Sequence, residues 1–131
     1  MSILSGPRLR IMLSLAPILV NRAAKKSDRL RQLLASAPGP IQFVAGKRPV
    51  GFYTVRAGAL RWKGGAHPKP SFTQVWKTPE SAFRELIGKD EPDIVGAFLA
   101  EQLKLFGNFQ SGLWFGEVMA IAKSTQAAPQ H

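Results

Sequence analysis

The chain has 131 residues, 45% of them hydrophobic, which suits one globular domain with an adequate core. It contains no cysteine, which excludes disulfides and thiolate metal sites, and its two histidines make a histidine metal site improbable. The net charge of +10 is uneven, because residues 1–77 hold fourteen Lys or Arg and one acidic residue, whereas residues 78–131 hold four and seven. The basic half should attract nucleic-acid phosphate, an acidic protein or anionic lipid headgroups.

The amino terminus combines a short basic start with an apolar run. Gly6-Pro7 should break any early helix, and residues 11–20 are apolar except for Ser14 and Pro17. A basic start before an apolar run resembles a secretory signal, but no small-x-small cleavage site follows it. The run is also about half of the ~20 residues that a membrane span needs.

Residues 17–37 predict one basic amphipathic helix, which Pro17 would begin or kink and Pro38-Gly39-Pro40 would end. Its apolar side chains recur at spacings of three, four or seven, and its cations occupy the remaining face. Two interpretations stay open: the helix docks on a sheet, or its basic face attaches to an anionic membrane. The membrane-contact cations would be Arg22, Lys25, Lys26 and Arg29. Residues 1–40 are thus expected to form a helical lead-in.

Alternating and β-branched residues predict strands next. These are 41–44, 50–55, 59–62 and 72–76. The first two read as a hairpin across the turn 45–49, and the third alternates apolar with basic residues. The Gly- and Pro-rich loop 63–70 contains His67, which we expect to be solvated.

The stretch 72–107 carries the clearest local signals. After its strand, Thr78 suits an N-cap, Pro79 the first helical position, and Ser81 lies three residues past the cap. Gly88 should end this helix in the manner of a C-cap glycine. A polar turn at 89–92, a short helix with the apolar stripe Ile94, Val95, Phe98 and Leu99, and a fifth strand at 103–106 complete the stretch. Segregated strands and helices predict an α+β fold with a largely antiparallel sheet covered by helices on one face.

The segment 111–123 is apolar on nearly every side, with Glu117 as its one carboxylate. A domain of this size can hardly bury a terminal helix on every side, so the pattern predicts a hydrophobic cavity or an exposed apolar patch. An ordinary buried terminal helix or an oligomer contact are the alternatives. Residues 124–131 are expected to form a disordered tail.

Catalytic constellations are not found. No nucleophile triad can be built around His67, and Gly64-Gly65 is followed by no helix signal and so is not a phosphate loop. The carboxylates Glu80, Glu85, Asp90, Glu91 and Asp93 lie on predicted helix starts and turns. The sequence gives no positive indication of an enzyme, a cofactor or a metal.

The order of motifs in residues 41–122 resembles the sterol carrier protein 2 (SCP2) lipid-binding family. The motifs are Thr78-Pro79-Glu80-Ser81-Ala82-Phe83, Leu86-Ile87-Gly88-Lys89, Ala97-Phe98-Leu99 and Leu103-Lys104-Leu105-Phe106-Gly107-Asn108. Ala100-Glu101-Gln102 departs from the family, which usually has a glycine there. The lead-in is similar to that of SCP2-like accessory proteins of bacterial ubiquinone biosynthesis.

The resemblance implies a non-enzymatic carrier, with a five-stranded sheet and helices around an apolar tunnel for sterols, fatty acyl chains or isoprenoid and quinone-type lipids. The family-like domain would span residues 41–123. Carried over to this sequence, the lipid-binding residues would be Trp62, Trp76, Phe83, Leu86, Ile87, Val95, Phe98, Leu99, Leu103 and Leu105, with Trp114, Phe115, Val118 and Met119 as a movable lid. Expected partners are a lipid, an anionic membrane surface, and a second copy or a biosynthetic complex. The expected location is cytoplasmic, peripheral to the inner membrane.

Two rival functions stay open. An accessory or assembly factor of a lipid or ubiquinone biosynthesis complex would use residues 114–121 as an oligomer face. A nucleic-acid-binding module is the less favoured rival. It would place the cations of 22–31 with Arg56, Arg61 and Lys63 on phosphates and stack bases on Trp62, but no base-reading motif is present.

Overall fold

The computed structural model describes residues 5–87 and 92–127. Within these ranges the chain forms five helices and five strands, in the order two helices, four strands, two helices, one strand and one helix. They are α1 (Ser5–Ala24), α2 (Asp28–Ala35), β1 (Ile41–Ala45), β2 (Arg48–Arg56), β3 (Ala59–Gly64), β4 (Phe72–Trp76), α3 (Pro79–Leu86), α4 (Ile94–Leu99), β5 (Leu103–Gly107) and α5 (Phe109–Ala127). The strands match the predicted ones in order and lie within a few residues of the predicted bounds.

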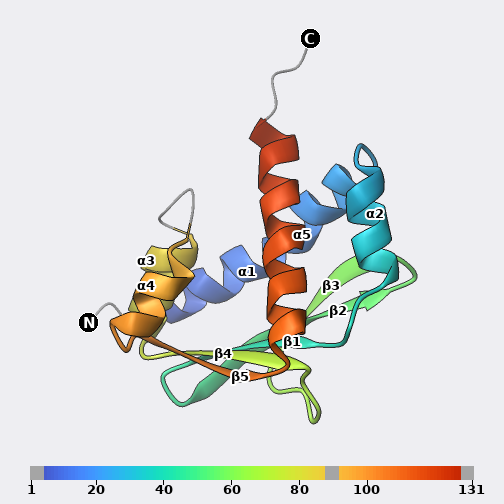
Figure 1. The fold of residues 1–131 in the computed structure, drawn as a ribbon. Coiled ribbons are helices and arrows are strands. Elements are labelled where there is room, and N and C mark those ends of the chain that lie inside the picture. The colour runs from blue at the N-terminus through green and yellow to red at the C-terminus, as the bar shows by residue number, and fades with distance from the viewer. Residues whose placement is uncertain (1–4, 88–91, 128–131) are drawn as a thin grey trace.

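The five strands form one sheet in the order β3-β2-β1-β4-β5. Neighbouring strands are antiparallel except for the central pair, in which β1 runs parallel to β4. Figure 1 shows the helices on one side of this sheet, with α5 standing over its middle. The fold is therefore the predicted α+β class, with a mixed, largely antiparallel sheet.

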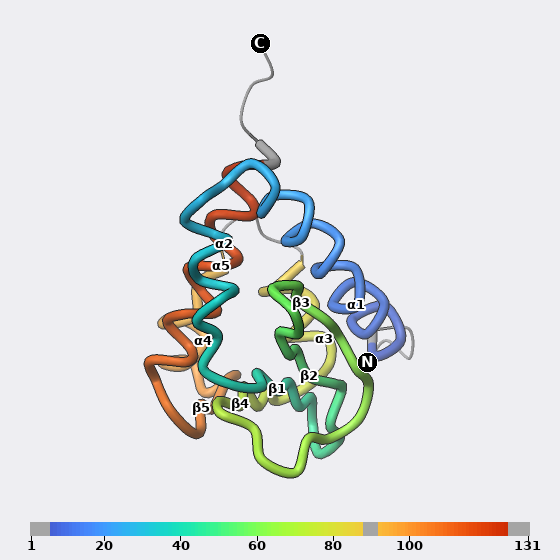
Figure 2. Tube along the Cα trace, turned by 90° about the vertical axis from the view of Figure 1, so that its right-hand side faces the viewer, coloured from blue at the N-terminus to red at the C-terminus, as the bar shows by residue number. Residues whose placement is uncertain are grey.

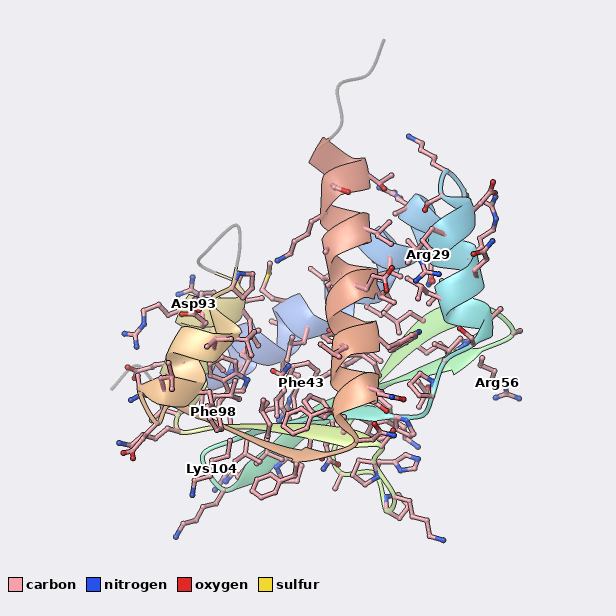
Figure 3. The ribbon with its side chains drawn as sticks, viewed as in Figure 1. Arg29, Phe43, Arg56, Asp93, Phe98 and Lys104 are labelled. Atoms are coloured by element: carbon pink, nitrogen blue, oxygen red, sulfur yellow. The ribbon has the colours of Figure 1, made fainter. Side chains whose placement is uncertain are left out.

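The two faces of the sheet differ in chemistry because successive residues of a strand point to opposite sides. The face beneath the helices carries core residues, including Ile41, Phe43, Tyr53, Leu60, Phe72, Trp76 and Leu103. The opposite face carries Arg61, Lys63 and Lys104, and Figure 3 shows Lys104 extending away from the helices. His67 partly covers that face: its ring meets Phe52 edge-on at 4.9 Å and its backbone N–H donates to Gln42 Oε1. It is half-buried where a solvated residue was expected.

Helix α1 corrects two expectations. It begins at Ser5, so Gly6-Pro7 does not break it, because proline is tolerated in the first turn, where its missing N–H would have no partner. It also continues through Pro17. The missing N–H of Pro17 leaves the carbonyl of Leu13 without its helical donor, and the buried hydroxyl of Tyr53 donates to that carbonyl at 2.6 Å.

The predicted single helix over 17–37 is wrong, because the chain turns between α1 and α2. Ser27 caps α2 by accepting the Leu30 N–H at 3.1 Å, which starts a new helix. Figure 2 shows α1 and α2 diverging from this turn. Side chains of both helices, among them Leu9, Val20 and Leu34, are fully buried in the common core. The lead-in is thus an integral part of the folded unit.

The remaining helices follow their cap signals. Thr78 and Ser81 form a reciprocal capping box at α3 with Pro79 in the first turn, and Asp93 caps α4 by accepting the Gly96 N–H at 2.8 Å. The predicted stop at Gly88 and most of the turn 89–92 lie outside the described residues. Helix α5 is longer than the predicted 111–123 and continues to Ala127, through part of the expected disordered tail. The rest of that tail, 128–131, also lies outside the description.

Candidate functional site

The centre of the helix-facing surface is an aromatic cluster contributed by three strands and α5. Phe115 stacks on Tyr53 at 5.3 Å between ring centroids and meets Phe43 edge-on at 5.7 Å. Trp62 packs against Tyr53 at 4.9 Å. The indole of Trp62 therefore faces the helices, and Trp62 is half-buried.

Helix α5 is fixed to its surroundings at several points. The Trp114 indole N–H donates to the Leu33 carbonyl of α2 at 2.7 Å, and the Ser111 and Ser71 hydroxyls are hydrogen-bonded to each other at 2.5 Å. Glu117 forms two hydrogen bonds with the Arg29 guanidinium, at 2.9 and 3.2 Å. Of the residues predicted as a movable lid, Trp114, Phe115 and Val118 are buried and Met119 is half-buried. These contacts hold α5 against α2 and the sheet.

Helix α4 has the opposite character. Val95, Phe98 and Leu99 are 69%, 51% and 75% exposed, and among its side chains only Ala97 is buried. The helix lies against β5, the edge strand, and Figure 3 places Phe98 at the end of α4 nearest the sheet. At the other end of β5, where α5 starts, Phe109 and Leu113 are also exposed. With respect to the residues that the structure describes, three large apolar side chains on one six-residue helix are thus more than half exposed.

The other predicted lipid-binding residues are core or half-buried. Trp76 and Leu103 are buried, and Leu105 is half-buried in the middle of β5. Three residues on α3 or just after it, Phe83, Leu86 and Ile87, are half-buried. The Arg8 guanidinium of α1 stands 4.7 Å from the centroid of the Phe83 ring, a cation–π contact that joins these helices.

A pocket of about 320 Å³ lies between α3, α4 and the ends of β4 and β5. Its lining is largely polar and comprises Trp76, Ser81, Arg84, Glu85, Asp93, Gly96, Ala97, Ala100 and Gln102. Glu85 is buried near the C-terminal end of α3, where the sequence suggested a helix start or turn, and its carboxylate accepts the Asp93 N–H. Trp76 is the one predicted lipid-binding residue in this lining. The predicted apolar tunnel is therefore distinct from this pocket and stays a prediction.

A polar pair within the apolar face was missed from the sequence. Gln74 lies on β4 between Phe43 of β1 and Leu105 of β5 and is only 6% exposed. Its Oε1 accepts a hydrogen bond from the Trp76 indole N–H at 3.1 Å. The helix-facing surface of the sheet thus combines apolar side chains, an aromatic centre and one amide in the described residues.

Helix α1 carries a second exposed apolar surface. Ile11, Leu15 and Ile18 recur at helical spacing and are about half exposed. Arg22 in the last turn of α1 is exposed, as are Lys25 and Lys26 in the turn that follows the helix. Arg29 is engaged with Glu117, and that hydrogen bond raises the pKa of Arg29. Figure 2 shows α1 and α4 on opposite sides of the molecule.

Two absences apply to residues 5–87 and 92–127. No helix there combines the length and apolarity required to cross a bilayer. No group of three or more His, Asp or Glu side chains there is placed to hold a metal ion.

No family model matches the sequence, and no curated protein matches it either. Solved structures do match. The UbiJ-SCP2 ubiquinone synthesis protein superposes with a TM-score of 0.63 at 13% identity, over 88% of this chain and 96% of that one. The solution structure of the sterol carrier protein domain 2 of Helicoverpa armigera gives 0.60 at 13% identity, over 95% and 90%. Apo sterol carrier protein 2 from Yarrowia lipolytica gives 0.56 at 11% identity, over 84% and 91%. The chain therefore has the fold of SCP2 domains, which confirms the resemblance at the level of architecture.

Proposed function

We propose that the chain binds a hydrophobic lipid beneath α4, between the helices and the β4–β5 side of the sheet, and carries or presents it without chemical change. The observation that carries this proposal is the exposed apolar face of α4, because a small helix with Val95, Phe98 and Leu99 in water calls for an apolar partner. The SCP2 fold supports the same function by analogy. Burying a lipid chain against such a surface gains ~25 cal/mol per Å² of apolar area.

The contacts of the two helices indicate which one opens. Helix α5 is held to α2 and to the Ser71 segment by hydrogen bonds, whereas α4 is short and presents its larger side chains to solvent. We infer that α4 is the mobile cover and that Leu103, Leu105 and Trp76 form the floor. The buried residues of α5 first assigned to a lid, Trp114 and Phe115, then act as the wall.

The test is lipid uptake by the purified protein. Native mass spectrometry should show a bound long-chain lipid, and titration with a fluorescent fatty acyl probe should saturate. The variant Val95→Ser/Phe98→Ser/Leu99→Ser should bind at least about tenfold more weakly, because each large apolar contact is worth ~1.5–3 kcal/mol when fully buried. Phe106→Ser is the matched control, since Phe106 is an exposed aromatic residue on the opposite face of β5. No uptake by the wild type would contradict the carrier function.

We propose further that the α1 side docks on an anionic membrane. The apolar stripe Ile11, Leu15 and Ile18 and the exposed cations Arg22, Lys25 and Lys26 together have the chemistry of an interfacial helix. Because α4 lies on the opposite side, a docked molecule would leave α4 accessible to a partner enzyme.

Flotation with phosphatidylglycerol vesicles tests this docking. Arg22→Gln/Lys25→Gln/Lys26→Gln should lower vesicle binding, with the effect diminishing at high salt. Arg61→Gln/Lys63→Gln/Lys104→Gln removes the same charge from the open sheet face and should leave binding nearly unchanged. Equal loss in both variants would show that net charge alone governs binding and would refute a defined docking side.

The accessory or assembly function is the second candidate, and the exposed Phe109 and Leu113 at the start of α5 favour it. An apolar face of this kind suits a second copy or another subunit of a lipid biosynthesis complex. Multi-angle light scattering across a range of concentrations checks it. A molecular mass that rises with concentration, and that Leu113→Ser reduces to that of the monomer, would support this function over a monomeric carrier.

A further inference from the structure

Gln74 is the one amide on the helix-facing side of the sheet in the described part of the chain. The other polar side chain on that face, Tyr53, already donates its hydroxyl to the Leu13 carbonyl. Register places Gln74 opposite Phe43 on one side and Leu105 on the other, in the middle of an apolar surface. A buried amide in such surroundings costs free energy unless its donors and acceptor are paired.

The orientation of this amide is fixed by Trp76. An indole N–H can only donate, so the atom that it meets at 3.1 Å must be the carbonyl oxygen Oε1. Both hydrogens of Nε2 therefore point away from Trp76, and Nε2 has no acceptor among the described residues. Every fully enclosed side-chain N or O of these residues has a partner, so Nε2, which has none, is not fully enclosed.

Gln74 lies near the edge of the sheet. Only β5 separates Gln74 from the edge, a distance of about 4.8 Å between neighbouring strands, and α4 packs against β5. A lipid chain lying along β5 beneath α4 would pass beside Leu105 and bring its functional group to Gln74. The strand residues that surround Gln74 on this face carry no cation to neutralise a buried carboxylate or phosphate; they are Phe43, Leu105, Phe72 and Trp76. Arg84, which lines the polar pocket with Trp76, is exposed to solvent.

We propose that Gln74 Nε2 donates a hydrogen bond to the ligand, and that the ligand is an uncharged lipid bearing a carbonyl or ether oxygen. This inference rests on the proposed carrier function and narrows its substrate class. A pure hydrocarbon leaves the amide unpaired, and a charged headgroup is buried without a counter-ion. Neither penalty applies to an uncharged lipid with one oxygen acceptor.

A matched pair of probes tests the proposal: 2-nonadecanone and its methylene isostere, in which CH₂ replaces the carbonyl oxygen. Each probe is offered in phosphatidylcholine vesicles, and the amount bound is measured by mass spectrometry of the separated protein. The preference of the wild type for the ketone over the isostere should exceed that of Gln74→Met by about five- to tenfold, the worth of one hydrogen bond. Comparing the two proteins cancels the different affinities of the probes for vesicles.

Binding of the isostere reports whether the variant still folds and carries lipid. The double variant Gln74→Met/Trp76→Phe removes the indole donor that Gln74→Met leaves unpaired, and it should show the same lost preference. Uptake of both probes with no difference between wild type and Gln74→Met would overturn the role of Gln74 and leave the carrier function standing. Uptake of neither probe by the wild type would overturn the carrier function itself.

Discussion

The hydrogen bond between Tyr53 and α1 allows a quantitative test of how the lead-in joins the sheet. Tyr53→Phe removes only the hydroxyl and keeps the ring packed against Phe43 and Phe115. The Leu13 carbonyl then has no donor, because the residue four positions later is Pro17. An unsatisfied buried acceptor costs ~1–3 kcal/mol, and we expect Tyr53→Phe to lower the free energy of unfolding by that amount.

A double-mutant cycle with Pro17→Ala separates this cause from any general effect of the substitution. The alanine N–H can donate to the Leu13 carbonyl as in an ordinary helix, so the cost of Tyr53→Phe should fall by about 1 kcal/mol or more in the Pro17→Ala background. Urea unfolding followed by far-ultraviolet circular dichroism gives each free energy, and an unchanged m-value shows that the denatured states are comparable. Equal costs in the two backgrounds would refute the assignment of the Tyr53 hydroxyl to the gap left by Pro17.

Two other predictions concern the same layer. Burial raises the pKa of the Tyr53 phenol, so the unfolded state loses this proton at a lower pH than the folded state does. The free energy of unfolding should therefore be unaffected by this group below about pH 10 and should fall as the pH rises above it. Tyr53 is the one tyrosine of the chain, so the difference in urea midpoint between the wild type and Tyr53→Phe above about pH 10 reports the titration of Tyr53. If both midpoints fall in parallel with rising pH, Tyr53 is not the cause of the decline. Gly51→Ala should destabilise the fold by ~1–3 kcal/mol, because a Cβ there would clash with the Trp62 ring and stand 2.6 Å from the Lys63 carbonyl oxygen. If Trp62→Ala relieves part of that cost in a thermal melt, the ring contributes to it; if the cost persists in full, the Lys63 carbonyl is responsible.

Elements with local signals were predictable from the sequence. The box formed by Thr78 and Ser81 lies within four residues and needs no tertiary contact, and Asp93 caps its helix in the same way. Strand alternation likewise placed Phe72 and Trp76 on one face. These signals lie among residues close in sequence, so the elements that they predict do not depend on tertiary contacts.

Features that depend on distant partners were not predictable. The parallel pairing of β1 with β4 joins residues about thirty apart, and no turn signal specifies it. Helix α1 continues through Gly6-Pro7 and Pro17. The burial of Leu9 and Leu13 and the hydrogen bond from the Tyr53 hydroxyl offset the helical contacts that these residues weaken. Period-two alternation does put Gln74 on the apolar face, but its free Nε2 follows from the Trp76 contact, which only the folded chain reveals.

The central parallel pair also sets an order of events for the growing chain. Strands β1, β2 and β3 form a meander from residues close in sequence, but the free edge of β1 waits for β4, which arrives after the loop at 65–71. Until then β1 presents unpaired backbone groups with Phe43 and Val44 beside them, the kind of edge that recruits other chains. Closure of the sheet needs a long-range contact and is therefore slower than formation of the meander. Newly made molecules are consequently most prone to aggregation in the interval between synthesis of residue 64 and docking of β4.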